Sequence, residues 1–345
     1  MLSCRFLFWR LSALAFLAAI AALLFRPVFA GPVASAESAG DGTDRAFWLD
    51  LIDGETAAQA TVLVDLAQVD VVYAGETHSI DRHHAVQLLL LRALDERGVP
   101  LVLCLEQIEA RRQPAVDRFN RGELDFEGLA REIDWGRTWK NYADYRALCE
   151  YAQARGIPVC ALNAPAEVIR AVSRGGGIAR LDSAGRGVLP ADIVLDDPPY
   201  ERLMNLLLSV HMAMDPEKLR PVFEAQVARD ETMAENIVTA RRLPIASGAG
   251  KAGQLAGRAR TAFVVCGSGH VRFGLGTPDR VRRRSPGIVD RVVLVTRSGQ
   301  LKLGEAEKAA ARPVEIPHRE LRALDRPPAD YLHVLPWQEE GDRPE

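Results

Sequence analysis

Two segments of this chain end an apolar run with the pattern Gly-x-x-His. Residues 71–74 lead into Gly-Glu-Thr-His, which places Glu76 two positions before His78. Residues 263–266 lead into Gly-Ser-Gly-His, which ends at His270. Imidazole and carboxylate groups serve as general acids and bases, and together they also ligate divalent metals. The pattern therefore points to acid–base or metal chemistry.

The location of these groups at the ends of apolar runs supports that interpretation. A run rich in β-forming residues and closed by glycine is typical of a buried strand, and ligands of open parallel sheets collect beyond the carboxyl ends of such strands. Glu106 closes the apolar run 101–105, and Asn163 closes the next one. We expect these side chains to share one rim of a sheet with His78 and His270.

A divalent metal is one interpretation of this group, with His78, His270, Glu76 and Glu106 as its ligands. Zinc, manganese, cobalt or iron suits imidazole and carboxylate ligands, and a metal-bound water would then be the nucleophile for hydrolysis. Glu76 or Glu106 would act as the general base. For each residue alone, the alternative is that it caps a helix or satisfies buried backbone. As a group they favour a site, because ionisable residues are expensive to bury without purpose.

Further polar residues are candidates for contact with a ligand, and Asn163 is one of them. His83 and His84 fall in the first turn of the expected helix after the first strand. Imidazolium is unfavourable near a helix N-terminus, so we expect neutral rings, of which only one can point well into a cleft. Asp230 and Glu231 lie in a long helical segment, where they either belong to a solvated charged face or contribute to the site.

The elements that must position these residues alternate along the chain. Strands are expected over residues 70–75, 100–105, 157–162, 262–266 and 290–296, with helices between them, beginning at 81–97. Such alternation is typical of βαβ units. We predict an α/β fold with a mainly parallel sheet flanked by helices. A longer helical pattern over about 199–242 predicts an added helical subdomain, either packed on the sheet or covering a ligand.

The N-terminus has the layout of a secretory signal peptide, with arginines before an apolar stretch and small residues directly after it. The stretch is shorter than the ~20 residues that a spanning helix needs. Cleavage is expected after Ala30 or after Ala36, which predicts a periplasmic or secreted protein without a stable membrane span. The expected division is a signal peptide (1–30), a flexible lead-in (31–45), the main domain (46–311) and a C-terminal tail (312–345).

Charge and cysteine content narrow the class of protein. The formal net charge is −3, and loss of the signal peptide removes three arginines and no acidic residue, which leaves −6. This balance argues against nucleic acid as the main partner. The later cysteines, Cys104, Cys149, Cys160 and Cys266, form no Cys-x-x-Cys pair. We expect buried thiols, although an oxidising compartment permits a disulfide.

Taken in order, these motifs resemble the ChaN-like haem-binding uptake proteins, within the wider Tiki, TraB and erythromycin-esterase superfamily. The resemblance spans nearly the whole mature chain. It is carried by Tyr73-Ala74-Gly75-Glu76-Thr77-His78, His83-His84 with Gln87, Leu105-Glu106, Trp135 and Trp139 with Tyr142, Leu162-Asn163-Ala164-Pro165, Gln226, residues 229–234, Gly267-Ser268-Gly269-His270-Val271, residues 274–280 and Ala329-Asp330-Tyr331.

The resemblance implies a bacterial envelope protein that is linked to iron and binds haem, as a homodimer. In the wider superfamily the presumed active centre corresponds to Glu76, His78, Glu106 and His270, and some relatives are metal-dependent peptidases while others hydrolyse lactones. Two hypotheses follow. The protein binds haem or another iron-bearing small ligand between the sheet rim and the helical part, or it is a divalent-metal-dependent hydrolase of peptides, lactones or esters.

Overall fold

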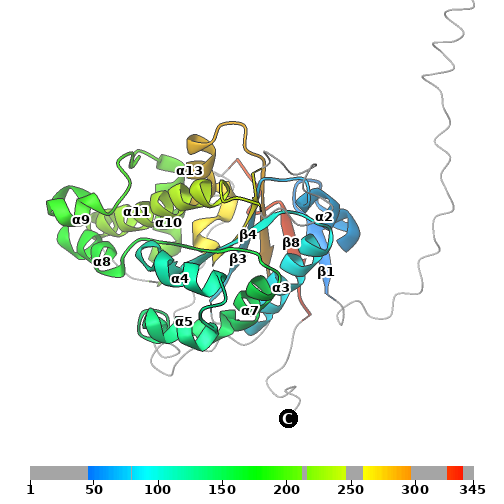
Figure 1. The fold of residues 1–345 in the computed structure, drawn as a ribbon. Helices are drawn as coiled ribbons and strands as arrows, with labels where there is room; N and C mark the ends of the chain where they lie inside the picture. The colour runs from blue at the N-terminus through cyan, green and yellow to red at the C-terminus, as the bar shows by residue number, and fades with distance from the viewer. Residues whose placement is uncertain (1–45, 79, 212–215, 246–258, 297–324, 337–345) are drawn as a thin grey trace, which may run out of the picture. The chain divides into compact units, whose positions relative to one another are not determined.

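The protein is built on an eight-stranded sheet, seen in a computed structural model that describes residues 46–78, 80–211, 216–245, 259–296 and 325–336 (Figure 1). The strands are β1 (Phe47–Asp50), β2 (Glu55–Ala57), β3 (Val71–Glu76), β4 (Leu101–Glu109), β5 (Val159–Asn163), β6 (Thr261–Gly267), β7 (Asp290–Val295) and β8 (Tyr331–Val334). Their order is β2-β1-β8-β7-β3-β6-β4-β5, and only β1 pairs antiparallel, with β2 and β8. The predicted α/β fold with a mainly parallel sheet is confirmed.

Helices cover both faces of this sheet (Figure 1). The described helices are α2 (Gln59–Leu66), α3 (Asp81–Glu96), α4 (Gln113–Asn120), α5 (Phe126–Glu132), α6 (Trp135–Thr138), α7 (Arg146–Ala154), α8 (Ala166–Gly175), α9 (Ser183–Gly187), α10 (Pro198–His211), α11 (Pro216–Ala240) and α13 (Thr277–Arg284). Short 3-10 turns are η1 (Ala110–Arg112), η2 (Tyr142–Tyr145), η3 (Ile178–Arg180), η4 (Ser268–His270) and η5 (Arg272–Gly274). Helices α2 to α5 and α7 pack on one apolar core, and α11 and α13 pack on the other.

The central strands are buried on both faces, which is why their sequences are continuous apolar runs. Glu76 ends β3, but Glu106 does not end its strand as expected, because β4 continues to Glu109. Alternation sends these two carboxylates to opposite layers. Ala74 of β3 belongs to the core under α3, and Glu76, two residues later in the strand, points to the same face. Cys104 of β4 belongs to the core under α11, and Glu106, two residues later in the strand, points to that face. Because successive side chains of a strand alternate between faces, Glu76 faces the α3 layer and Glu106 faces the α11 layer.

The predicted helical segment 199–242 consists of two helices, α10 and α11. Helix α11 packs against α8, α13 and β5, and therefore joins the helical part to the sheet. Its buried face carries Met233, Ala234 and Ile237. The long helical pattern thus supplies one layer of the fold.

Strand β8 lies inside the segment that the sequence assigns to the C-terminal tail. Residues 331–334 pair with β1 on one side and with β7 on the other. The run is only four residues long and its partners are distant in sequence, so no local pattern predicts it. The expected signal peptide and lead-in lie outside the described residues. None of the helices that the structure describes is long and apolar enough to cross a membrane.

Candidate functional site

Glu76 ends β3 in a fully buried position and is held by three uncharged donors. Gln87 of α3 donates to Oε2 at 2.7 Å, and Gln107 of β4 donates to Oε1 at 3.2 Å. The Tyr145 hydroxyl also donates to Oε1. Burying a carboxylate is unfavourable unless it is paired and hydrogen-bonded. These partners come from three separate elements, so the position of Glu76 depends on the assembled fold.

Two imidazoles complete the surroundings of Glu76. His78 Nδ1 lies 2.7 Å from Oε1, and His84 Nδ1 lies 3.3 Å from Oε2. The ring of His78 also lies over Gly267, where a Cβ atom would be 2.8 Å from Nε2 and 3.6 Å from Glu106 Oε2. The Gly267 N–H donates to that same Oε2 at 2.7 Å. The missing side chain of Gly267 therefore lets His78 and Glu106 approach each other.

The second imidazole of the paired motifs lies between two carboxylates. His270 Nε2 is 3.2 Å from Glu106 Oε1, and its Nδ1 is 2.7 Å from Asp230 Oδ1. Asp230 also accepts hydrogen bonds from Tyr200 at 2.6 Å and from Thr277 at 2.7 Å. This chain of contacts connects α10, α11 and α13 with β4 and with η4, which follows β6. The structure thus brings His78, Glu106 and His270 to one rim of the sheet.

Mutual charge compensation shifts the titration of this group. Burial opposes ionisation of Glu106, but the charge and hydrogen bond of His270 outweigh it and lower the pKa of Glu106 to about 2. Burial opposes protonation of His270, yet the neighbouring carboxylates raise its pKa to about 10. Despite burial, His78 and His84 hold the pKa of Glu76 well below its usual range, and Glu76 raises the pKa of both histidines. These shifts favour ionised glutamates opposed by protonated imidazoles, most strongly at His270.

The four predicted metal ligands meet, but their geometry is not that of a metal site. In the part of the chain that the structure describes, no group of three or more His, Cys, Asp or Glu side chains could hold a metal ion. Metal binding requires neutral imidazole. Here His78 and His270 share their ring nitrogens' protons with carboxylates, and Glu76 and Glu106 accept hydrogen bonds. The divalent-metal prediction therefore has no support in this donor set.

The predicted ligand-binding residues separate into two kinds. His83 is occupied by backbone, because its Nδ1 accepts the N–H of Thr77 at 3.0 Å and its Nε2 lies 3.1 Å from the Thr296 carbonyl. Both His84 and Asn163 are buried, and in the described part of the chain each has one polar atom without a hydrogen bond; that of His84 lies 4.0 Å from Asp144 Oδ2. Among the described residues, Nε2 of His84 and Oδ1 of Asn163 have no hydrogen-bond partner.

Glu231 follows Asp230 in α11 but belongs to a different cluster. Its side chain is fully buried and accepts two hydrogen bonds from Arg283, at 2.7 and 3.0 Å, and one from Arg284. Arg280 Nε lies 3.5 Å away. These arginines all belong to α13, so Glu231 pairs α11 with α13 across a buried ionic contact.

Sequence reasoning missed four members of the centre. Gln107 follows Glu106 in β4 and so faces the other layer, toward Glu76; strand alternation could have found it. Tyr145 lies in a cluster of aromatic residues that is more simply interpreted as core packing. Tyr200 and Thr277 reach Asp230 from the first turns of α10 and α13, and no local motif marks them.

One family model matches most of this chain. Residues 62–281 match the family described as haem-binding uptake, Tiki superfamily, ChaN. The matched range contains every residue of the centre, from Glu76 to Thr277. No curated protein matches the sequence.

Solved structures with a similar fold include one of cofacial heme binding to ChaN of Campylobacter jejuni. That protein is 17% identical, and the alignment covers 84% of this chain and 96% of that chain with a TM-score of 0.60. A mutant of the erythromycin esterase EreC is 11% identical over 86% of this chain and 99% of that chain, with a TM-score of 0.43. RRSP, a MARTX toxin effector domain from Vibrio vulnificus, is 16% identical over 72% of this chain and 37% of that chain, with a TM-score of 0.40.

The close approach at Gly267 gives a direct test of the centre. Its φ of −59° is ordinary for alanine, so Gly267→Ala introduces a Cβ only 2.8 Å from His78 Nε2 without straining the backbone. We expect His78 to be displaced and the free energy of unfolding to fall by about 1–3 kcal/mol, as in other overpacked sites. Urea unfolding measures the change, and the NMR signals of the His78 ring report its displacement.

Gly269→Ala is the matched control, because a Cβ there meets open space. It should change the free energy of unfolding by less than about 0.5 kcal/mol. Equal stability of the two variants, with unchanged His78 signals in both, would show that His78 does not lie against Gly267.

Proposed function

We propose that this protein binds haem or another iron-bearing ligand and takes part in iron uptake. The reason is that the chain belongs to the ChaN family of haem-binding uptake proteins within the Tiki superfamily. The observation that carries this proposal is the family match over residues 62–281, which includes the complete polar centre. The likeness in fold to ChaN of Campylobacter jejuni is consistent with it.

The rim offers groups that suit a haem. Its exposed member is His78, whose side chain is 39% accessible, whereas Glu76 and Glu106 are buried. Trp139 meets the His78 ring edge-on at 4.9 Å and adds an aromatic surface beside it. A bound haem supplies an iron whose axial positions accept nitrogen or oxygen ligands. The proposal assigns contact with the haem to His78 and Trp139.

The remaining predicted residues take supporting roles in this proposal. Asn163 Oδ1 has no hydrogen-bond partner among the described residues, and His84 Nε2 has only the ion pair with Asp144 at 4.0 Å, so these two atoms are assigned to a ligand. His83, Asp230 and Glu231 have their polar atoms engaged within the fold and act as positioning residues. We further propose that the protein is exported through its N-terminal signal-like segment and acts as a homodimer, as the resemblance implies.

A second candidate function, hydrolysis of an ester, lactone or peptide, is favoured by one observation at the same centre. His78 is accessible from solvent while its Nδ1 is bound to Glu76, which is the arrangement of an imidazole oriented by a carboxylate. The hydrogen bond to Glu76 and the charges of Glu106 and Glu76 raise the pKa of His78, which favours the protonated, acidic form of the ring. It becomes a base only above the ordinary imidazole range.

Haem binding is tested by titrating the purified protein with hemin and following the Soret band. We expect a saturable shift, and for His78→Ala an affinity at least about tenfold weaker, because that variant loses the accessible donor of the rim. Lys140 is exposed and follows Trp139 in the sequence, and the Lys140→Ala variant should bind hemin like the unchanged protein. A titration without any spectral shift would end the haem proposal.

Hydrolysis is tested with p-nitrophenyl esters and lactones across pH. If His78 is the general base, the rate rises as pH increases through its raised pKa, and His78→Gln lowers kcat by about 100-fold or more. Lys140→Gln again serves as the control, and a chelator in parallel assays shows whether a metal takes part. Activity no faster than buffer, or retained in His78→Gln, rules out this function.

A further inference from the structure

Two cysteines lie opposite each other on neighbouring strands of the sheet. Cys104 of β4 is the register partner of Cys160 of β5 in a parallel pair. Both face the core under α11, Cys104 as a member of it and Cys160 packed against it. Neighbouring strands lie about 4.8 Å apart, which is within the ~4.4–6.8 Å that separates the Cα atoms of disulfide-bonded residues. The two thiols are therefore placed for a bond between the strands.

The other two described cysteines are not placed in this way. Cys149 of α7 packs in the core on the opposite face of the sheet. Cys266 faces the same core as Cys104, but the residue of β6 opposite Cys104 is Val264, two positions before Cys266. All four described cysteines are free thiols in the structure. The strand register thus singles out one pair, Cys104 and Cys160.

The two thiols of this pair differ in exposure. Cys104 is completely buried, whereas Cys160 lies on the edge strand of the described sheet and is partly exposed. The hydrogen bond with Cys160 and burial both raise the pKa of the Cys104 thiol. A thiolate is the nucleophile in thiol–disulfide exchange. An oxidant from solvent would therefore react first with Cys160.

The pair lies directly before a bulge in β4. From Leu105 to Glu109 strand β4 advances four residues, whereas its partner β5 advances only two, from Ala161 to Asn163. Bulges of this kind redirect the side chains that they carry. Glu106, one of the two buried carboxylates of the rim, falls within this bulge. Its position depends on how β4 is held on either side.

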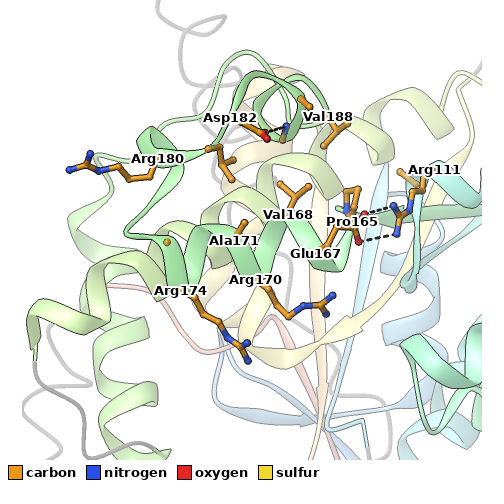
Figure 2. Close-up of a pocket in the computed structure, with 15 residues that line it drawn as sticks. Arg111, Pro165, Glu167, Val168, Arg170, Ala171, Arg174, Arg180, Asp182 and Val188 are labelled. Atoms are coloured by element: carbon orange, nitrogen blue, oxygen red, sulfur yellow. Dashed lines mark hydrogen bonds and ion pairs between the residues drawn. The ribbon is translucent and has the colours of Figure 1, made fainter.

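Beyond the bulge, side-chain contacts already hold the two strands together. Glu109 Oε1 accepts the N–H of Ala166 at 2.8 Å. Arg111, which follows β4, forms two hydrogen bonds with Glu167 of α8, which follows β5 (Figure 2). A bond between the two cysteines would hold the strands before the bulge as well, so that Glu106 would lie between two fixed points.

We propose that Cys104 and Cys160 are a redox site that a disulfide-bearing oxidant converts into a cross-strand disulfide, which fixes β4 before its bulge. The Cys160 thiolate attacks one sulfur of the oxidant, forms a mixed disulfide and releases the first thiol. The Cys104 sulfur then attacks Sγ of Cys160 and releases the second. Two electrons reduce the oxidant, and the two cysteine protons end on its thiols. The proposed export would bring the protein into a compartment that holds such oxidants.

The test treats the reduced, purified protein with oxidised glutathione. The remaining thiols are blocked with iodoacetamide in denaturant, and tryptic peptides are mapped by mass spectrometry without a reductant. Cys104 and Cys160 fall in separate peptides, residues 98–111 and 156–170. We expect most of these two peptides to be joined, at a mass two hydrogen atoms below their sum, and to separate in dithiothreitol.

Cys160→Ser and Cys149→Ser are the matched variants, since each removes one thiol. Cys160→Ser should give no joined peptide. Cys149→Ser should give as much as the unchanged protein, because Cys149 lies on the other face of the sheet. The proposal is overturned if glutathione remains on Cys160 without a link to Cys104, if both cysteines are recovered alkylated, or if Cys104 is joined to Cys266 instead.

Fixation of the strands is measured by urea unfolding of the oxidised and reduced forms. A bond that closes the chain between residues 104 and 160 restricts the unfolded state. The midpoint should therefore move to higher urea on oxidation, return in dithiothreitol and stay unchanged in Cys160→Ser. A joined pair whose midpoint does not rise would contradict the fixation of β4. None of these readouts uses haem or an ester, so they are independent of the proposed function.

Discussion

The structure of the rim depends on the need to compensate two buried carboxylates. Glu76 ends β3 and Glu106 lies within β4, on either side of β6 in a sheet whose central strands are buried on both faces, and each carboxylate is almost completely removed from water. A carboxylate in such a place stays ionised only with charged or hydrogen-bonding partners. His78, His84 and His270 supply the opposing charges, and Gln87, Gln107, Tyr145 and the Gly267 N–H supply the remaining donors.

This compensation explains why distant segments converge. His270 lies in η4 because β6 ends beside β3 and β4, and it is then fixed between Glu106 and Asp230. The same arrangement leaves His78 the most exposed of the three imidazoles at this rim, with a side chain 39% accessible against 7% for His84 and His270. The other charged groups determine the protonation and orientation of His78.

Much of the fold follows from local sequence, and the site follows in part. The apolar runs that end in glycine predict β3 and β6, and the apolar run 101–105 predicts the first part of β4. That run does not predict the end of the strand, because β4 continues past Glu106 to Glu109. Strand β8 could not be predicted, because four residues are too few to show an alternating apolar pattern and its partner strands are far away in the chain. Asp230 and Glu231 show a second limit of prediction from local sequence. They are adjacent in sequence, yet helical geometry turns one toward His270 and the other toward the arginines of α13. Only the packed helices separate their roles.

The protonation of the rim is measured most directly by NMR titration of the histidine rings, with His78→Gln, His84→Gln and His270→Gln used for assignment. Charge compensation by the glutamates predicts that all three rings titrate above the ordinary value of 6.5, and that His270 holds its proton until about pH 10. In the same account the stability that His270 contributes is complete below pH 6.5 and is lost as pH rises through 10. A His270 ring that titrates at or below 6.5 contradicts the account.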